Sequence, residues 1–203
     1  SEVMIIADKT APLDWAAADL LAQAEHGQGS RVFLVSDDEK VFSYIEAELR
    51  SQMNSLWSTE DKKHQKRHIL ALEVFKNTFY EICVKKFSLA GEVANRIAPE
   101  HVQVMARNAK ALASKITTAG AIFLGPCSPT VLGDYVAGPS HTLPTGGAGR
   151  SFSGLRIQDF RRRTSVIEYN TASLKRALHH LEAVANAEGL EAHARSARIR
   201  VSK

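Results

Sequence analysis

Short apolar runs alternate with segments of helical spacing over most of this chain, and this alternation restricts the possible folds more than any other feature. Runs with the aliphatic, β-branched and aromatic content of strands occupy residues 3–7, 31–35, 78–84, 102–104 and 121–124. Helical patterns lie between them at 13–26, 37–49, 89–96 and 108–117, and the charged stretch 51–76 predicts helix with an exposed, variable connection inside it. Strands that alternate with helices predict a mostly parallel sheet covered on both faces. We therefore expect a Rossmann-like α/β fold with three layers, αβα.

The pattern changes near the C-terminus, where helix alone is predicted. From Thr171 onward leucines recur at helical spacing, and a basic tail follows. This segment is too short to bury a core of its own, so we expect it to pack on another body, such as a second subunit. The 203 residues accordingly divide into a predicted Rossmann-like domain over 1–155 and a helical dimerisation segment over 156–203.

Composition argues against several classes of function. The chain has 44% hydrophobic and 24% charged residues, which is ordinary for a globular protein, and no apolar run approaches the roughly 20 residues that span a bilayer. Its first residues lack the basic region of a secretory signal, so we expect a cytoplasmic protein without a membrane partner. The formal net charge of +4 reflects basic residues gathered in 62–68 and 161–163. These segments lack the interleaved aromatic residues of a nucleic-acid surface, and no nucleic-acid partner is expected.

Two further patterns have plain structural interpretations. Cys83 and Cys127 are far apart and form no C-x-x-C spacing, which argues against a disulfide framework or a thiolate zinc site. Cys83 lies in a strand-like run and is expected in the core. The glycine-rich segment 145–150 has neither the preceding strand nor the lysine of a phosphate-binding loop. We expect a flexible connection there.

An acid stands directly beside an imidazole at Glu100 and His101. Such a pair is suited to general acid–base catalysis, although neighbours in an extended strand point to opposite faces unless the chain bends after Pro99. Ligands of parallel α/β sheets bind beyond the carboxyl ends of the strands, so we expect this pair and the 125–145 loop at that edge. A surface acid beside a histidine that caps the backbone is the alternative interpretation.

A second group of side chains has the composition of a metal site. Gln23 and His26 share one face at the end of a helical segment, Asp134 and His141 lie in a loop rich in glycine and proline, and His193 follows near the C-terminus. The amide oxygen of Gln23, the carboxylate of Asp134 and the imidazoles of His26 and His193 form a mixed set that suits zinc or a similar divalent ion. Each residue alone also has a structural interpretation: a helix end for His26, an Asx turn for Asp134, a backbone cap for His141 and an exposed helix position for His193.

Several strings, in order along essentially the whole chain, resemble the histidinol dehydrogenase family. They are Ser1-Glu2-Val3, Gln23-Ala24-Glu25-His26-Gly27, residues 95–101, residues 133–135 with 138–145, and residues 188–193. The resemblance extends to the second, C-terminal half of that enzyme, so residues 1–155 would be part of a larger discontinuous domain. The family oxidises L-histidinol with NAD, through L-histidinal, to L-histidine in the last steps of histidine biosynthesis.

The resemblance implies a role for each residue of these strings. It implies one zinc ion per site, with ligands Gln23, His26, Asp134 and His193. It implies that Glu100 and His101 are the acid/base residues, with His101 taking the hydroxyl proton and Glu100 activating water. The substrate contacts that it implies are Ser1, His141 and Glu188, together with His101 and the zinc ligands.

The resemblance also implies a homodimer in which exchanged C-terminal helices bring Glu188 and His193 to the neighbouring subunit's site. The region that holds NAD belongs to the absent first half, so no cofactor-binding residues are expected here, and this chain alone should be inactive. The stretch 56–80 fits the family pattern poorly and lies away from every site string, which predicts an altered surface connection. Two alternatives remain open: an NAD-dependent dehydrogenase of another small polar alcohol, and a non-catalytic metal-binding or dimerisation module derived from the family.

Overall fold

The computed structural model describes residues 1–57 and 61–201. They divide into two compact units, Ser1–Asp159 and Phe160–Lys203. The connection that we expected within 51–76 falls on residues 58–60, which lie outside the described residues.

Five parallel strands form a single sheet in the first unit, in the order β3-β2-β1-β4-β5. The strands are β1 Glu2–Ala7, β2 Arg31–Ser36, β3 Phe79–Cys83, β4 His101–Met105 and β5 Ala121–Leu124. The α/β fold expected from the sequence is therefore confirmed. The strand order changes direction between β1 and β4, as in doubly wound sheets.

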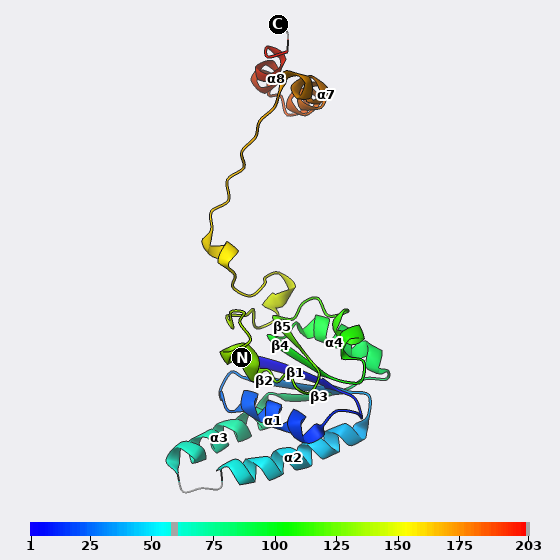
Figure 1. Cartoon of the computed structure of the whole chain (residues 1–203), viewed down its shortest axis with the longest axis vertical. Coiled ribbons are helices and arrows are strands. Elements are labelled where there is room, and N and C mark those ends of the chain that lie inside the picture. The colour runs from blue at the N-terminus through cyan, green and yellow to red at the C-terminus, as the bar shows by residue number, and fades with distance from the viewer. Residues whose placement is uncertain (58–60, 202–203) are drawn as a thin grey trace. The chain divides into compact units, whose positions relative to one another are not determined.

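Helices cover both faces of this sheet. The α-helices of the first unit are α1 Leu13–Ala24, α2 Glu39–Trp57, α3 Lys62–Asn77, α4 Ala90–Ile97, α5 Ala109–Ala113 and α6 Val131–Tyr135. Short 3₁₀ turns occupy η1 Phe87–Leu89, η2 Ala148–Arg150 and η3 Ile157–Phe160. Figure 1 shows α1, α2 and α3 on one face and α4 on the other.

Strand β1 explains why two cores form. Its residues are all buried, and successive side chains point to opposite faces of a sheet. Val3 and Ile5 accordingly enter the core beneath α1, α2 and α3. Met4 and Ile6 enter the core beneath α4 and α5. A central strand covered on both sides needs an unbroken apolar run, which is what the sequence provides.

Strand β3 differs because it pairs only with β2 and forms one edge of the sheet. Its residues are exposed or half-buried, and the thiol of Cys83 is exposed. The expectation of a core cysteine was therefore wrong. The run has the composition of a strand, but composition does not distinguish an edge strand from a central one.

The glycine-rich segment 145–150 is packed, where a flexible connection was expected. Its last residues form the turn η2, and a Cβ added to Gly149 would lie only 2.0 Å from the carbonyl oxygen of Thr118. The glycine at this position lets two backbone segments approach more closely than any side chain would allow.

The second unit consists of α7 Thr171–Ala187 and α8 Glu191–Arg198. Asn170 caps α7 by accepting a hydrogen bond from the Ser173 amide at 2.8 Å. Glu182 on α7 and Arg198 on α8 form an ion pair at 2.6 Å. The residues buried in these two helices are all alanines, Leu174 and Leu178 are half-buried, and Leu181 and Val184 of α7 are exposed.

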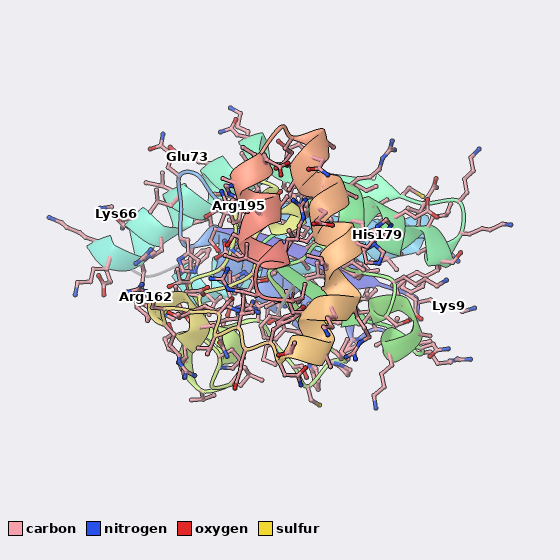
Figure 2. All side chains as sticks on the ribbon, turned by 90° about the horizontal axis from the view of Figure 1, so that it is seen from above. Lys9, Lys66, Glu73, Arg162, His179 and Arg195 are labelled. Carbon is pink, nitrogen blue, oxygen red and sulfur yellow. The ribbon has the colours of Figure 1, made fainter. Side chains whose placement is uncertain are left out.

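The surface has two further features relevant to function. No helix within 1–57 and 61–201 has the length and apolar character needed to cross a membrane. The basic side chains of 62–67 are exposed on α3, and Figure 2 shows Lys66 projecting away from the body of the protein.

Candidate functional site

A small cavity of about 190 Å³ brings together most of the residues that the sequence singled out. Its polar lining consists of Ser1, Gln23, His26, Glu100, His101, Thr130, Asp134 and His141. These residues come from five separate segments of the first unit, so only the fold places them around one space.

The cavity lies at the amino edge of the sheet, and the expectation of the carboxyl edge was wrong. Ser1 immediately precedes β1, and Glu100 immediately precedes β4. A helix that connects two parallel strands runs back along the sheet, so the end of α1 arrives at this same edge with Gln23 and His26. The carboxyl edge instead holds a separate crevice lined by acidic and basic loop residues that include Asp8 and Arg107.

A bend in the chain allows Glu100 and His101 to line the same cavity. Ala98 ends α4 in the left-handed region with φ 51°, a conformation that costs a non-glycine residue about 1–2 kcal/mol. After Pro99 the backbone turns toward β4, which begins at His101. Both side chains are nearly buried, at 8% and 5% exposure respectively.

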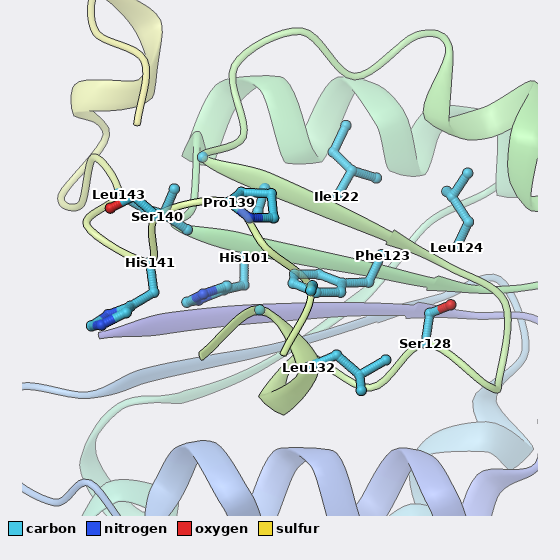
Figure 3. Close-up of a pocket in the computed structure, with 14 residues that line it drawn as sticks. His101, Ile122, Phe123, Leu124, Ser128, Leu132, Pro139, Ser140, His141 and Leu143 are labelled. Atoms are coloured by element: carbon cyan, nitrogen blue, oxygen red, sulfur yellow. The ribbon is translucent and has the colours of Figure 1, made fainter. Parts of the chain in front are cut away.

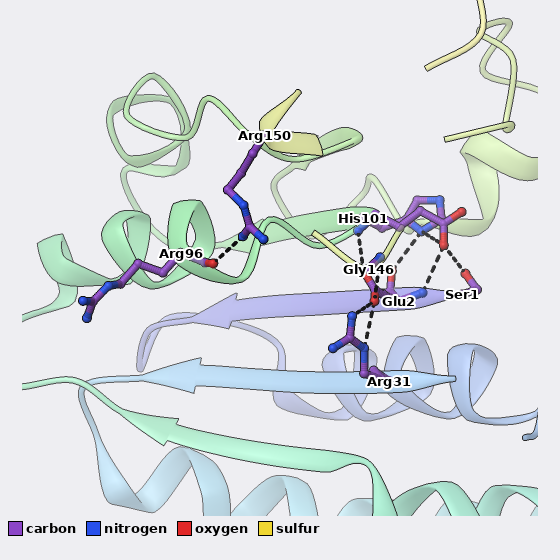
Figure 4. A network of polar contacts seen from close by, with 8 residues as sticks. Ser1, Glu2, Arg31, Arg96, His101, Gly146 and Arg150 are labelled. Carbon is purple, nitrogen blue, oxygen red and sulfur yellow. Dashed lines mark hydrogen bonds and ion pairs between the residues drawn. The ribbon is translucent and has the colours of Figure 1, made fainter. Parts of the chain in front are cut away.

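Hydrogen bonds hold the Glu100 carboxylate in place. Its Oε2 accepts a hydrogen bond from the Ser1 hydroxyl at 2.8 Å and from the Glu2 amide at 3.1 Å. The same oxygen lies 4.0 Å from Nδ1 of His101. Figure 4 shows Ser1, Glu2 and His101 gathered in this network. A carboxylate held in this way is oriented before any ligand arrives.

The imidazole of His101 has one bonded and one free nitrogen. Nδ1 lies 3.1 Å from the backbone oxygen of Glu2, and a carbonyl oxygen only accepts hydrogen bonds. The proton of the neutral ring therefore resides on Nδ1, and Nε2 carries the lone pair. Nε2 is buried and has no hydrogen-bond partner, so it is available as a base toward a bound ligand.

The end of α1 supplies an amide and a second imidazole. Gln23 is 6% exposed, and its Oε1 lies 3.3 Å from Ser1 Oγ, whose single proton goes to Glu100, whereas its Nε2 has no partner. Rotation about the last side-chain bond exchanges these two atoms, so the amide can offer its oxygen to the cavity. His26 follows one turn later and is exposed.

Asp134 lies in the short helix α6, where a loop was expected. Gly133 permits this placement, because a Cβ there would stand 2.8 Å from the ring of Phe123 on β5. The helix can therefore lie against the sheet edge and present Asp134 to the cavity. Asp134 is half-buried, and His141 on the following segment is exposed.

One buried carboxyl lies just behind the cavity. Asp19 stands one turn before Gln23 in α1 and is 9% exposed. Burial raises the pKa of Asp19, and the side chain of Gln103 on β4 offsets part of that rise. Gln103 is fully buried on the same face of β4 as His101.

Comparison with known proteins shows which family the chain belongs to. The family model described as histidinol dehydrogenase matches residues 1–201. The chain belongs to the histidinol dehydrogenase family. The resemblance inferred from the sequence strings is thereby confirmed.

Individual relatives support the same assignment. The histidinol dehydrogenase of Heliobacterium mobile is 43% identical over 203 residues, covering 100% of this chain and 46% of the relative. That of Aquifex aeolicus is 43% identical over 200 residues, covering 98% and 45%. The crystal structure of histidinol dehydrogenase from Elizabethkingia anophelis has a TM-score of 0.87 at 31% identity, covering 99% and 44%. The chain thus spans a little under half the length of the relatives it matches.

The predicted zinc ligands of this family member are only partly assembled within one unit. Gln23, His26 and Asp134 line the cavity, whereas His193 belongs to the second unit, as does the predicted substrate contact Glu188. Among the described residues, no three His, Cys, Asp or Glu side chains cluster closely enough to hold a metal. The first unit supplies two such side chains and one amide to the predicted set. This donor chemistry, with a buried amide that has a free end, fits a divalent ion that takes its fourth ligand from elsewhere.

A larger apolar pocket adjoins the cavity and was missed by sequence reasoning. It has a volume of about 480 Å³ and shares His101 and His141 with the cavity. Figure 3 shows Phe123 and Leu132 along its wall, with the two histidines at one end. Most of its residues come from β5 and from the 128–143 segment. The apolar residues of 128–143 follow neither a helical nor a strand period, so no sequence pattern indicated that they line a pocket.

The unusual stretch 56–80 contacts a site string, although it is distant from all of them in sequence. Arg67 on α3 donates a hydrogen bond to the backbone oxygen of Glu25 at 2.6 Å. Leu70 packs against Gly27, where an added Cβ would lie 3.1 Å away. α3 therefore packs against the end of α1 that carries His26, so the expectation that this stretch lies away from every site string was wrong. Most side chains of α3 are exposed, as expected of a surface segment.

Proposed function

We propose that this chain is the zinc- and substrate-binding half, and specifically the C-terminal half, of a histidinol dehydrogenase. The reaction is the NAD-linked oxidation of L-histidinol through L-histidinal to L-histidine. One observation carries the proposal: the oriented carboxylate of Glu100 and the free Nε2 of His101 face the same cavity as Gln23, His26 and Asp134. Membership of the family supports the choice of substrate.

His101 serves as the base of the first oxidation in this proposal. Its Nε2 accepts the hydroxyl proton of the amino alcohol. At the same time a hydride moves to NAD from the carbon that carries this hydroxyl, which gives the aldehyde and NADH. The Glu2 carbonyl holds the proton on Nδ1 throughout. The imidazolium that forms lies 4.0 Å from the Glu100 carboxylate, which stabilises the positive charge.

Glu100 serves as the base of the second oxidation. It takes a proton from water as the water oxygen bonds to the aldehyde carbon, which gives the anion of the hydrate with the negative charge on the former carbonyl oxygen. Loss of a hydride from this anion to a second NAD gives the carboxylic acid, whose proton passes to His101 once His101 has released its first proton to solvent, and this leaves the carboxylate of L-histidine. The Ser1 hydroxyl, 2.8 Å from Glu100, is placed to contact the substrate beside this water.

Zinc would be held by Gln23, His26 and Asp134, with His193 as the fourth ligand and one ion per site. A bound zinc ion supplies charge that orients the imidazole and amine of the substrate. His141 and Glu188 complete the proposed substrate contacts. His141 lines both the cavity and the apolar pocket, which suits a residue that borders the substrate.

We further propose a cytoplasmic homodimer in which the C-terminal segment of one subunit completes the site of the other. The residues buried in α7 and α8 are all alanines, and Val184 and Leu190 remain 60% and 40% exposed. Exposed apolar side chains on a two-helix unit favour association with another body. His193 and Glu188 would reach a cavity in this way.

Substrate oxidation by the complete enzyme tests the proposal. The polypeptide that contains both halves should reduce NAD with L-histidinol, with two NADH formed for each L-histidine, whereas residues 1–203 alone should not. Another small polar alcohol, such as L-threoninol, is the control substrate. Equal turnover of the control would favour a related dehydrogenase, and zinc binding without any turnover would favour a non-catalytic module.

A further inference from the structure

The side chain of Glu2 is a buried carboxyl beside the cavity, and the reaction proposed above gives it no role. It begins β1 and is 3% exposed. Its Oε1 accepts a hydrogen bond from Nε of Arg31 at 2.8 Å and from the Gly146 amide at 3.1 Å. Its Oε2 accepts a hydrogen bond from the Glu100 amide at 3.3 Å. Figure 4 shows this carboxylate at the centre of the network.

The backbone of Glu2 contacts the acid/base pair a second time. Its amide donates to the Glu100 carboxylate at 3.1 Å, and its carbonyl oxygen lies 3.1 Å from Nδ1 of His101. Glu2 and Glu100 therefore exchange bonds reciprocally, each side chain accepting from the other's amide. Three polar atoms of one residue, its amide nitrogen, its carbonyl oxygen and Oε2, thus contact the two proposed bases, and Oε1 is held by Arg31 and Gly146.

Burial makes this arrangement costly unless every bond is present. Burying a carboxylate without hydrogen-bond partners lowers the folding stability by roughly several kcal/mol. Here one guanidinium and two amides satisfy it, and hydrogen bonds to a charged group are the stronger kind. An exposed ion pair contributes little to stability. Glu2 differs from a surface acid because it is buried and contacts both proposed bases.

We propose that Glu2 is a positioning residue for the reaction, whose buried carboxylate fixes the Glu100 backbone and ties the 141–146 segment to the acid/base pair. The inference rests on the proposed function. Arg31 and Gly146 act through Glu2, since they hold its carboxylate in place. His141 lies on the segment that Gly146 ends, so the same carboxylate sets that side of the cavity.

Replacement of Glu2 by glutamine in the complete enzyme is the test. Glutamine has the same shape but one acceptor oxygen, so it must turn an NH₂ group toward either the Glu100 amide or the Arg31 side. With L-histidinal as substrate, kcat per folded, zinc-loaded site should fall at least about tenfold, because small displacements of reacting groups are expensive. KM and zinc content should stay within about threefold of wild type, because Glu2 is neither a proposed substrate contact nor a proposed zinc ligand.

A matched control and a second variant keep the test decisive. Glu46→Gln changes an exposed glutamate paired with Arg50 and should leave kcat unchanged. Arg31→Met removes the cation alone and should lower the same kcat by a smaller factor. It serves in place of Glu2→Gln if that variant does not fold. Unchanged kcat per folded site in the folded variant overturns the proposal, because a purely structural role would alter only the folded fraction.

A spectroscopic readout separates this proposal from the proposed function. If the wild-type enzyme oxidises neither L-histidinol nor L-histidinal, the proposed function fails. Nitrogen NMR of ¹⁵N-histidine-labelled chain, with His101→Gln for assignment, then decides the positioning role. The His101 ring should keep the Nδ1–H tautomer in both proteins, because the Glu2 carbonyl is retained, and its nitrogen signals should shift in Glu2→Gln because the Glu100 carboxylate, 4.0 Å from Nδ1, is displaced. An identical ring signal in the two proteins overturns the positioning role.

Discussion

The two sides of the cavity are held to different degrees. The floor, formed by Ser1, Glu100 and His101, lies at the starts of β1 and β4 and is fixed by hydrogen bonds of 2.8 to 3.1 Å. The opposite side, formed by His26 and Asp134, comes from the ends of short helical segments and is exposed or half-buried. The groups proposed to transfer protons are thus placed at the sheet itself. The groups proposed as zinc ligands are placed at its periphery.

The largest expected effect comes from disabling the floor without moving it. Glu100→Gln in the complete enzyme keeps the shape and the Ser1 bond but removes the base. Oxidation of L-histidinal should slow by about 10²- to 10⁴-fold, the usual contribution of a general base. Zinc content should stay at the wild-type value. Stopped-flow NADH formation measures the rate, and a wild-type rate of aldehyde oxidation would remove Glu100 from its proposed role.

Substitutions on the opposite side of the cavity should change the affinity for zinc. Asp134→Ala or His26→Ala in the complete enzyme should weaken zinc binding by more than the roughly 10- to 100-fold that loss of an outer partner costs. Competition with a chromophoric chelator measures the affinity. His180→Ala, at an exposed position of α7, is the matched control and should bind zinc normally. Full zinc affinity after either ligand change would contradict the ligand assignment.

Two glycines allow a direct steric comparison of the sides. A Cβ at Gly120 would stand 2.6 Å from the backbone oxygen of Glu100, whereas one at Gly133 would meet the Phe123 ring at 2.8 Å. The backbone oxygen of Glu100 cannot move away from an added Cβ as easily as the Phe123 ring at the edge of the sheet can. Gly120→Ala should therefore lower the free energy of unfolding by about 1–3 kcal/mol, and Gly133→Ala should lower it by less. Thermal unfolding measures both.

Gly91→Ala is the control for these two glycines. It lies in α4, where the nearest atom to an added Cβ is 3.5 Å away. Because alanine is favoured in helices, this change should raise the stability by about 0.5–1 kcal/mol. A larger loss at Gly133 than at Gly120 would mean that the peripheral side is the more rigid one.

The sequence predicted the sheet well and the edge of the cavity badly. The apolar runs of β1 and β2 mark central strands because both of their faces are covered. The cavity edge depends on where α1 returns, and no local pattern records it. Asp134 was expected in a loop because a five-residue helix is too short to show a period.

Glu2 shows why some functional positions escape sequence reasoning altogether. It is one acid at the start of a strand, and its side-chain partners lie 29, 98 and 144 residues away. No spacing connects residues so far apart. Glu100 and His101 were found because they are adjacent, and Gln23 and His26 because they share a helical turn. The placement of His193 and Glu188 in a neighbouring site stays a prediction.

The smallest expected effect concerns the seam between the two sides, where α1 packs on β4. Asp19 on α1 has a pKa raised by burial, and Gln103 on β4 offsets part of the rise. A carboxyl whose folded pKa lies above its unfolded value contributes stability that is complete below the unfolded pKa, near 3.9 or so. That contribution is lost as the pH rises through the folded pKa.

Asp19→Asn removes this dependence. Its urea midpoint relative to wild type should therefore increase as the pH rises from about 4.5 to about 8. Asp14→Asn on the first turn of α1 is the control, because Asp14 is an exposed carboxyl of the same helix, and it should show no such trend. An Asp19→Asn midpoint that moves in parallel with wild type across this range would mean that the seam is not electrostatically strained. The floor and the metal side would then be joined by apolar packing of α1 alone.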